Sequence, residues 1–171
     1  KEDPNASNEE IDKYEKLLIE SNQTNGYISE AAELARMNWW TAEYGMIGNL
    51  KNPKIYGAGL LSSVIEGFES INPKVEKINY NLDCINFNYD ITEQQPQLFV
   101  TDNFNTLTNL LNEYAKTMAY QTGGINGIKK AKGSKTVTTT ILDSNLSVSG
   151  VLENYHSDDD KPSYLQFNGP T

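Results

Sequence analysis

The chain has 171 residues, 37% of them hydrophobic and 10% aromatic, so it can build a core, and this composition excludes a fully disordered protein. Its formal net charge is −9 and no basic stripe interrupts the acidity, which argues against nucleic acid or an anionic membrane surface as a partner. No apolar run approaches the roughly 18 residues that a transmembrane helix needs.

The first predicted element is an amphipathic helix that begins at a capping box, with Ser7 as the N-cap and Glu10 three residues later. The polar segment 21–26 then predicts a turn. The apolar residues of this helix fall on one face: Ile11, Tyr14, Leu17 and Leu18.

A second helix is predicted to begin near Ser29 and to end around Gly45 and Gly48, because glycine is typical of helix C-termini. Residues 49–53 predict a polar connection. The apolar stripe of this helix contains three residues: Leu34, Met37 and Trp40.

The segment 55–71 predicts a tight glycine bend followed by a short helix. Gly57 and Gly59 are interpreted as turn residues, and Ser62 and Ser63 as serines of the first turn that satisfy free backbone N–H groups. The predicted apolar face of the helix consists of Leu60, Leu61, Val64 and Phe68.

Alternating apolar residues between 75 and 89 predict a β-hairpin, with Cys84 as a small buried residue of its second strand. This single cysteine cannot form an internal disulfide, which favours a reducing, cytoplasmic location. Residues 97–100 predict a further strand, and Asp102 is the expected cap of a third helix. That helix has an i, i+3, i+4 pattern of Leu107, Leu110, Leu111, Tyr114, Ala115 and Met118.

The C-terminal third predicts a change of domain. Residues 1–121 are assigned to a mixed, helix-rich unit, 122–134 to a Gly/Lys-rich linker, and 135–171 to the start of a small β module that we expect to be incomplete. Within the module, 143–145 predicts a turn, and the acidic stretch 157–162 separates two further strands. Because the chain begins without Met, we expect it to be an excised segment of a longer protein.

Two places in the sequence contain residues that could take part in catalysis or metal binding. Helical spacing places Glu43 one turn after Trp39 and Trp40, so this carboxylate needs an ion pair, hydrogen bonds or a metal. From spacing alone both a structural ion pair, for which Arg36 is a candidate partner, and a functional carboxylate remain open. His156 stands beside three aspartates, 158–160, where a metal site is conceivable and a solvated loop is the simpler interpretation.

Two sequence blocks are more informative about function than residue spacing. WWTAEYGMIGNLKNPKIYGAGLLSSVIE at 39–66 resembles the distal half of the catalytic domain of the aromatic amino acid hydroxylases, which are iron- and tetrahydropterin-dependent monooxygenases. NYDITEQQPQLFV at 88–100 is similar to the family's YxxTxxQPxxFV segment. The bacterial phenylalanine 4-hydroxylase branch is the most similar. The resemblance implies an α+β fold, with the helix-rich distal part of the catalytic domain followed by a small all-β module.

The resemblance also implies roles for individual residues. In the family, Fe(II) is held by two histidines and one glutamate, and the matching glutamate is Glu43. Four residues match positions that line the aromatic-substrate pocket: Trp39, Tyr44, Gly59 and Ser62.

Further roles follow from the same match. Ser62 matches a position that orients a ligand histidine. Glu66 matches a position that either supports the metal ligands through hydrogen bonds or forms an ion pair. Ala35 and Asn38 match positions on the pterin side, although the family usually has Tyr where this chain has Asn38.

The family's HxxxH ligand pair does not occur in this sequence. We therefore expect the segment alone to be inactive and a full-length parent to use O2, Fe(II) and tetrahydropterin on an aromatic amino acid, with phenylalanine first among the substrates. An alternative function is a non-catalytic binding or assembly module on the same scaffold. A weaker one is a hydrolase that uses Glu43 with Glu66. The sequence gives no prediction of oligomeric state.

Overall fold

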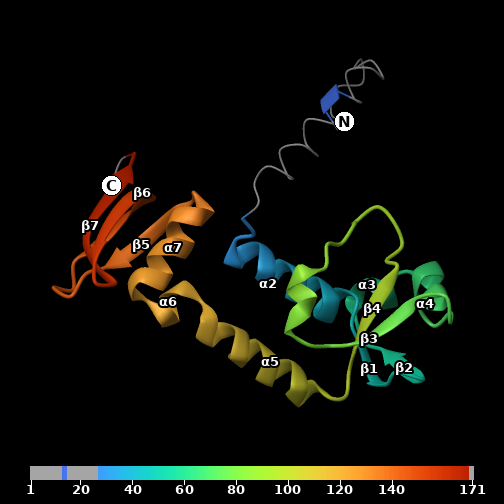
Figure 1. Ribbon diagram of the computed structural model, residues 1–171. Helices are drawn as coiled ribbons and strands as arrows, with labels where there is room; N and C mark the ends of the chain where they lie inside the picture. The colour runs from blue at the N-terminus through green and yellow to red at the C-terminus, as the bar shows by residue number, and fades with distance from the viewer. Residues whose placement is uncertain (1–12, 15–26, 170–171) are drawn as a thin grey trace.

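The computed structural model describes residues 13–14 and 27–169 (Figure 1). Helices and a four-stranded sheet form a body, and the long helix α5 leads from it to a three-stranded sheet at the other end of the molecule. The predicted α+β class is confirmed. The predicted capping box at Ser7 and the turn at 21–26 lie outside the described residues. Within the described ranges, no helix is long and apolar enough to cross a membrane.

Helix α2, Glu30–Asn38, begins where the sequence predicts. The Ser29 side chain caps it by accepting a hydrogen bond from the Ala32 N–H at 3.2 Å. From Trp39 the winding loosens into the π-helix η1, Trp39–Glu43, where the Tyr44 N–H donates to the Trp39 carbonyl at 2.8 Å. Such i→i−5 turns are rare and occur frequently at functional sites.

The body sheet has the strand order β2-β1-β4-β3. The segment predicted as a polar connection is a hairpin, because β1 and β2 pair in antiparallel fashion on either side of residues 50–51. Strand β4 runs parallel to both β1 and β3 and is buried over Leu98–Thr101. The strands are β1 Met46–Asn49, β2 Asn52–Ile55, β3 Glu76–Asn79 and β4 Gln97–Thr101.

The predicted hairpin at 75–89 is wrong. Only β3 is a strand, and it pairs with β4. The Asn81 side chain then accepts a hydrogen bond from the Asp83 N–H at 2.8 Å and begins a 3-10 helix, η2, Leu82–Asn86. Leu82 and Ile85 both pack on the core, as residues three apart do in a 3-10 helix, whereas in a strand they would face opposite sides. Cys84 is fully buried as expected.

Two short helices replace the single one predicted after the glycine bend: α3 Ala58–Ser62 and α4 Val64–Ser70. Ser63 separates them because its backbone is extended and its side chain caps α4 by accepting from the Glu66 N–H. Helix α5, Phe104–Thr117, is capped by Asn103 instead of the predicted Asp102, since the Asn103 side chain accepts from the Thr106 N–H at 3.1 Å.

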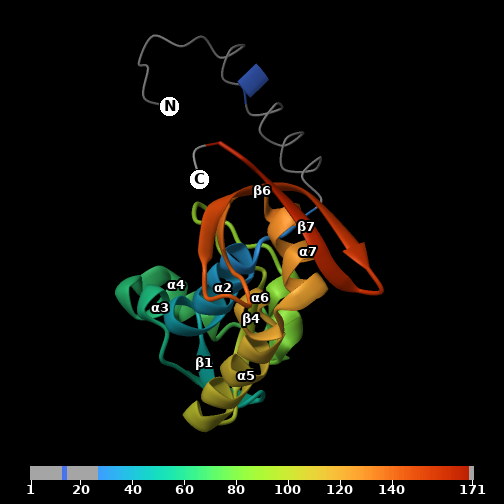
Figure 2. The ribbon, with the colours of Figure 1, turned by 90° about the vertical axis from the view of Figure 1, so that its left-hand side faces the viewer.

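The C-terminal sheet has the antiparallel order β5-β6-β7, built from β5 Val137–Ile141, β6 Ser147–Asp158 and β7 Lys161–Asn168. The predicted turn at 143–145 is confirmed, and Asn145 takes the left-handed conformation it requires (φ 63°). Short helix α6, Ala119–Thr122, precedes helix α7, Gly124–Ser134, which occupies the predicted linker and packs under the sheet (Figure 2).

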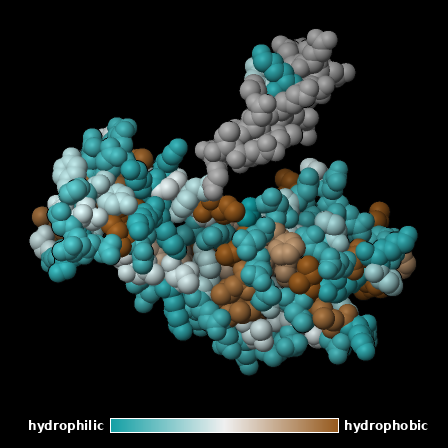
Figure 3. Space-filling view, viewed as in Figure 1, coloured by the Kyte–Doolittle hydropathy of each residue, from teal (hydrophilic) through white to brown (hydrophobic). Residues whose placement is uncertain are grey.

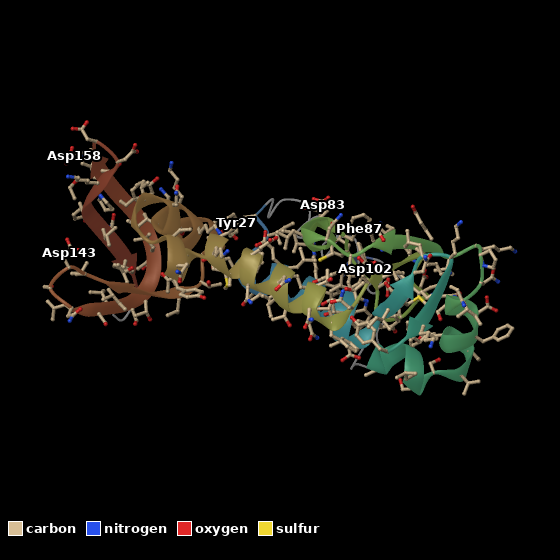
Figure 4. All side chains as sticks on the ribbon, turned by 90° about the horizontal axis from the view of Figure 1, so that it is seen from below. Tyr27, Asp83, Phe87, Asp102, Asp143 and Asp158 are labelled. Carbon is tan, nitrogen blue, oxygen red and sulfur yellow. The ribbon has the colours of Figure 1, made fainter. Side chains whose placement is uncertain are left out.

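A polar cluster joins α2 to the helices that lead into this sheet. One oxygen of Glu30 accepts from the Ala119 N–H and from Lys130, both at 2.8 Å. The Tyr114 hydroxyl donates to Glu33 at 2.6 Å. Tyr27 lies at this junction, with its ring against Gly133 of α7 (Figure 4).

We expect the protein to lose stability at alkaline pH. Burial raises the pKa of the Cys84 thiol from 9.0 to about 11 and that of the Tyr56 hydroxyl from 10.0 to about 12. Both groups hold their proton more tightly in the folded chain than in the unfolded one, so the stabilisation is complete below pH 9 and falls between pH 9 and 12. Urea unfolding at pH 8, 10 and 11 measures this loss.

The matched variant is Tyr56→Phe, which removes one titrating group. Its free energy of unfolding is expected to fall less steeply with pH between 10 and 12 than that of the wild type. A free energy of unfolding that stays constant from pH 8.5 to 11.5 would contradict the argument.

Candidate functional site

Glu43 lies at the end of the π-helix, and its half-buried side chain forms no hydrogen bond or ion pair within the described part of the chain. Arg36, the candidate ion-pair partner, instead donates to the Ile85 carbonyl at 2.6 Å and to the Asn88 side chain. The Coulomb attraction that a structural ion pair would supply is therefore absent among these residues. Of the two alternatives that spacing leaves open, the structural ion pair with Arg36 is therefore not formed.

The glycine bend packs directly against the backbone of Glu43. A Cβ at Gly57 would overlap the Glu43 carbonyl, and one at Gly59 would lie 3.1 Å from the same oxygen and 3.0 Å from the Tyr44 ring. The N–H groups of Tyr56 and Gly57 both donate to the Gly45 carbonyl, which ties the bend to the end of the π-helix. Gly57 is thus required for close approach, a stronger constraint than the turn role predicted from sequence, and Gly59 lies in tight contact with the same carbonyl.

Three aromatic rings form a stack beside Glu43, which we name the ring stack: Tyr44, Trp39 and Tyr89. Trp39 lies between the two tyrosines, with centroid distances of 4.6 Å to Tyr44 and 4.3 Å to Tyr89 and interplanar angles of 21° and 12°. Each stacked pair contributes about 1 kcal/mol beyond burial. The indole Nε1 of Trp39 is buried and has no hydrogen-bond partner among the described residues.

Trp40 anchors the stack to the core. Its ring is fully buried and meets Phe99 at 5.4 Å and Tyr89 edge-on at 6.4 Å. Its Nε1 donates to the Phe87 carbonyl at 3.2 Å, so the chain that carries Tyr89 is fixed at Phe87, which Figure 4 labels in the body of the molecule.

The loop that follows Tyr89 is fixed from its far end by a buried amide. The Gln95 side chain, 4% exposed, donates to the carbonyls of Asp90 and Glu93. The role of Tyr89 cannot be derived from spacing, since the only signal for it is its place in the block NYDITEQQPQLFV. The fold brings this block onto Trp39.

Tyr44 connects the stack to helix α4, because its hydroxyl donates to both carboxylate oxygens of Glu66, at 3.2 and 3.4 Å. Burial raises the pKa of Tyr44, and the Glu66 charge and hydrogen bond raise it further. Glu66 therefore holds a ring of the stack instead of pairing with a cation. A small hollow opens beside this contact, lined by Tyr44, Leu60, Glu66, Ser70, Val75, Gln94, Gln95 and Leu98.

The remaining predicted site residues lie around this cluster or apart from it. Ser62 is exposed, and its hydroxyl donates to the Gly59 carbonyl at 2.9 Å, so it does not cap the backbone N–H groups of a helix. Ala35 and Asn38 are exposed on α2, one turn apart. The structure thus brings together Trp39, Glu43, Tyr44, Gly59 and Glu66.

The described residues do not make a metal site on their own. No three His, Cys, Asp or Glu side chains gather there in a way that could hold a metal ion. His156 lies on strand β6 of the C-terminal sheet, 3.4 Å from Asp158, and both side chains are exposed. Glu43 is therefore a single donor, and iron would need further ligands from elsewhere.

The chain is similar to known proteins over part of its length. The family described as biopterin-dependent aromatic amino acid hydroxylase matches residues 23–161. Phenylalanine-4-hydroxylase of Caenorhabditis elegans is 36% identical over 87 residues, 50% of this chain and 19% of that protein. Protein henna of Drosophila melanogaster is 28% identical over 127 residues, 74% of this chain and 27% of that protein. Tyrosine 3-monooxygenase of Rattus norvegicus is 33% identical over 87 residues, 50% of this chain and 18% of that protein.

Among solved structures, the iron- and phenylalanine-bound phenylalanine hydroxylase of Chromobacterium violaceum is 30% identical, with a TM-score of 0.45. The similarity covers 50% of this chain and 35% of that one. The chain thus spans about a fifth to a quarter of the length of the curated relatives. The family match includes the ring stack and Glu43 and extends through β5 and β6. This protein belongs to the family of biopterin-dependent aromatic amino acid hydroxylases.

Proposed function

We propose that this chain supplies the carboxylate ligand and one aromatic wall of the active site of a monooxygenase that hydroxylates an aromatic amino acid. The observation that carries the proposal is Glu43, which has no ion pair among the described residues and lies at the end of a π-helix beside the ring stack. Iron, tetrahydropterin and O2 would be the other participants. The histidine ligands of the iron would come from a segment outside this sequence, and the 171 residues alone would be inactive.

The chain's own residues would bind and orient the substrate and the ligand. The ring stack would present an apolar aromatic wall to a substrate ring, through the face of Tyr44 that is turned away from Trp39 and through the edge of Trp39, whose two faces are covered by Tyr44 and Tyr89. Gly57 and Gly59 hold the Glu43 backbone in place by close contact. The bound metal would supply a positive charge that offsets the cost of burying this carboxylate.

Phenylalanine is the substrate we propose first, because the C. elegans phenylalanine-4-hydroxylase is 36% identical and the rat tyrosine 3-monooxygenase 33%. We retain three sequence-based assignments as part of the proposal. Ser62 would orient a ligand histidine, and Ala35 and Asn38 would lie on the pterin side. The bacterial source, the cytoplasmic location and the domain boundaries 1–121, 122–134 and 135–171 also stay predictions.

The decisive experiment replaces Glu43 by Ala in the complete hydroxylase that carries this segment and measures bound ferrous iron and hydroxylated product. We expect at least a 100-fold loss of activity together with loss of stoichiometric iron, because one of three ligands is removed. Glu93→Ala, an exposed residue on the 88–96 loop, is the matched control and should leave both unchanged. Retention of iron and activity by Glu43→Ala would remove the ligand assignment.

A second candidate function is a non-catalytic binding module on this scaffold. One observation favours it: within the described residues, Glu43 belongs to no group of three His, Cys, Asp or Glu side chains that could hold a metal ion. Calorimetric titration of Fe(II) into the 171-residue chain tests whether this chain alone can hold iron. We expect no stoichiometric binding. Tight binding would show that this chain forms a metal site unaided, contrary to both functions as stated.

A further inference from the structure

Helix α7 and the sheet β5-β6-β7 form one unit, which we name the α7–sheet unit, residues 124–169. Ile128 of α7 and Leu152 of β6 are both buried where the helix packs on the sheet. The Lys132 ammonium donates to the Asn154 side chain at 3.2 Å and lies 5.6 Å from the centre of the Tyr155 ring. Figure 3 shows the unit as a separate lobe whose visible side is largely hydrophilic or neutral. Any motion of the sheet would therefore carry α7 with it.

Two consecutive glycines join this unit to helix α6. Gly123 and Gly124 have positive φ angles of 53° and 51°, and the ψ angle of Gly123 is −159°, a combination that only glycine adopts readily. Both residues are exposed, and a Cβ at either would find no atom within 4 Å. No neighbouring group therefore resists a rotation of the backbone at this point. Such exposed residues at the ends of helices have the properties of a hinge.

A single side chain, Lys130, bonds the unit to the body across this hinge. Its ammonium donates to Glu30 of α2 and to the Thr117 carbonyl of α5, at 2.8 and 2.5 Å. Within the described part of the chain, these are the only hydrogen bonds from the α7–sheet unit to α2 or α5. One close packing contact accompanies them, because a Cβ at Gly133 would lie 2.5 Å from the Tyr27 ring.

Helix α2 keeps its own contacts when Lys130 is removed. Glu30 also accepts from the Ala119 N–H at 2.8 Å, and it lies in the first turn of α2, where the helix dipole favours a carboxylate. Glu33, one turn later, accepts the Tyr114 hydroxyl. The Lys130 and Glu30 side chains are 33% and 21% exposed, so dissolved salt partly screens their attraction. Breaking the ion pair thus frees α7 and leaves α2 joined to α6.

We propose that the α7–sheet unit swings on Gly123 and Gly124 and that the ion pair between Lys130 and Glu30 latches it closed. The closed position is the one in this structure. Loss of either charge, or high ionic strength, opens the latch and exposes to water the Tyr27 ring and the side of α7 that it covers. The fold therefore contains a conformational switch that is separate from the site at Glu43.

Electron–electron double resonance measures the position of the unit, with spin labels on Asn109→Cys of α5 and Ser144→Cys of the turn between β5 and β6. Both positions are exposed, and the native Cys84 is fully buried and should not be labelled. At about 0.1 M NaCl we expect one narrow distance distribution. At about 1 M NaCl, where the Debye length is about 3 Å, a second and broader population should appear.

Single charge changes identify the latch. At about 0.1 M NaCl, Lys130→Met is expected to raise the broad population at least about 5-fold, and Lys130→Arg, which keeps the charge, should retain the narrow one. Glu30→Gln still offers an acceptor to the Ala119 N–H and should open the unit as Lys130→Met does. The double variant should open it no further, because both changes remove the same ion pair. Lys129→Met, at the exposed neighbouring residue, is the matched control and should change nothing.

Gly123→Ala tests the hinge. Alanine rarely adopts the backbone angles of this residue, so the main distance should shift even at low salt. Gly169→Ala, at a glycine of positive φ (93°) that follows β7, is the control and should leave the distance unchanged.

Three outcomes would overturn the proposal. One is a narrow distribution that persists in both Lys130→Met and Glu30→Gln. Another is a wild-type distribution that is already broad at low salt, which would mean that nothing latches the unit. The third is a Gly123→Ala distance equal to that of the wild type. None of them bears on the assignment of Glu43, which the iron and activity measurements test separately.

Discussion

Replacing Trp40 by Ala is expected to lower the free energy of unfolding by about 4 kcal/mol. Trp40 is fully buried, packs on Phe99 and Tyr89, and donates to the Phe87 carbonyl. The substitution opens a cavity at the centre of the core and leaves that carbonyl without its donor. Urea or thermal unfolding followed by circular dichroism measures the loss.

One further variant separates packing from hydrogen bonding, and a second is a surface control. Trp40→Phe retains a ring but no N–H, and should cost about 2 kcal/mol because the Phe87 carbonyl stays unpaired and part of the volume is lost. Tyr120→Ala, at an exposed ring, should change stability by less than about 0.5 kcal/mol. A Trp40→Ala protein within 1 kcal/mol of the wild type would mean that the ring is not part of the core.

Gly57→Ala is expected to destabilise the chain by about 3 kcal/mol, at the upper end of the usual cost of overpacking. The added methyl group would overlap the Glu43 carbonyl and lie 2.6 Å from the Gly45 nitrogen, and both are backbone atoms that cannot rotate away. The backbone of Gly57 has φ −61°, which alanine adopts freely, so the cost comes from these contacts alone. The stabilisation from a stiffer unfolded chain, below about 1 kcal/mol, is too small to compensate.

The variant should also move Glu43 and the ring stack. Near-ultraviolet circular dichroism reports the packing of Trp39 against its tyrosines, and we expect its signal to fall in Gly57→Ala. Ala58→Gly, at the adjacent exposed position, is the control and should cost no more than about 1 kcal/mol without a spectral change. Equal stability of Gly57→Ala and the wild type would show that the bend does not press on Glu43.

Local signals predict many elements of this fold correctly. Ser29 begins α2, residues 97–100 form β4, and 143–145 form a turn, because each depends on side chains within a few residues of the backbone they order. The prediction fails at 75–89, where the alternation of apolar residues breaks at the three-residue step from Leu82 to Ile85, a spacing typical of a 3-10 helix. The Asn81 side chain begins that helix, and β3 alone pairs with β4.

The sequence by itself determined the family and the α+β class and pointed to Glu43 as the carboxylate that needs a partner, since these conclusions rest on residue blocks and local periodicity. Only the tertiary structure decided what surrounds Glu43: Tyr89 stacks on Trp39 from 50 residues away, and Gly57 presses on the Glu43 backbone. It also decided that Lys130 holds α7 against the start of α2, because its ammonium reaches Glu30, 100 residues earlier in the chain. Such contacts join distant segments, and local spacing holds no information on which segments will meet.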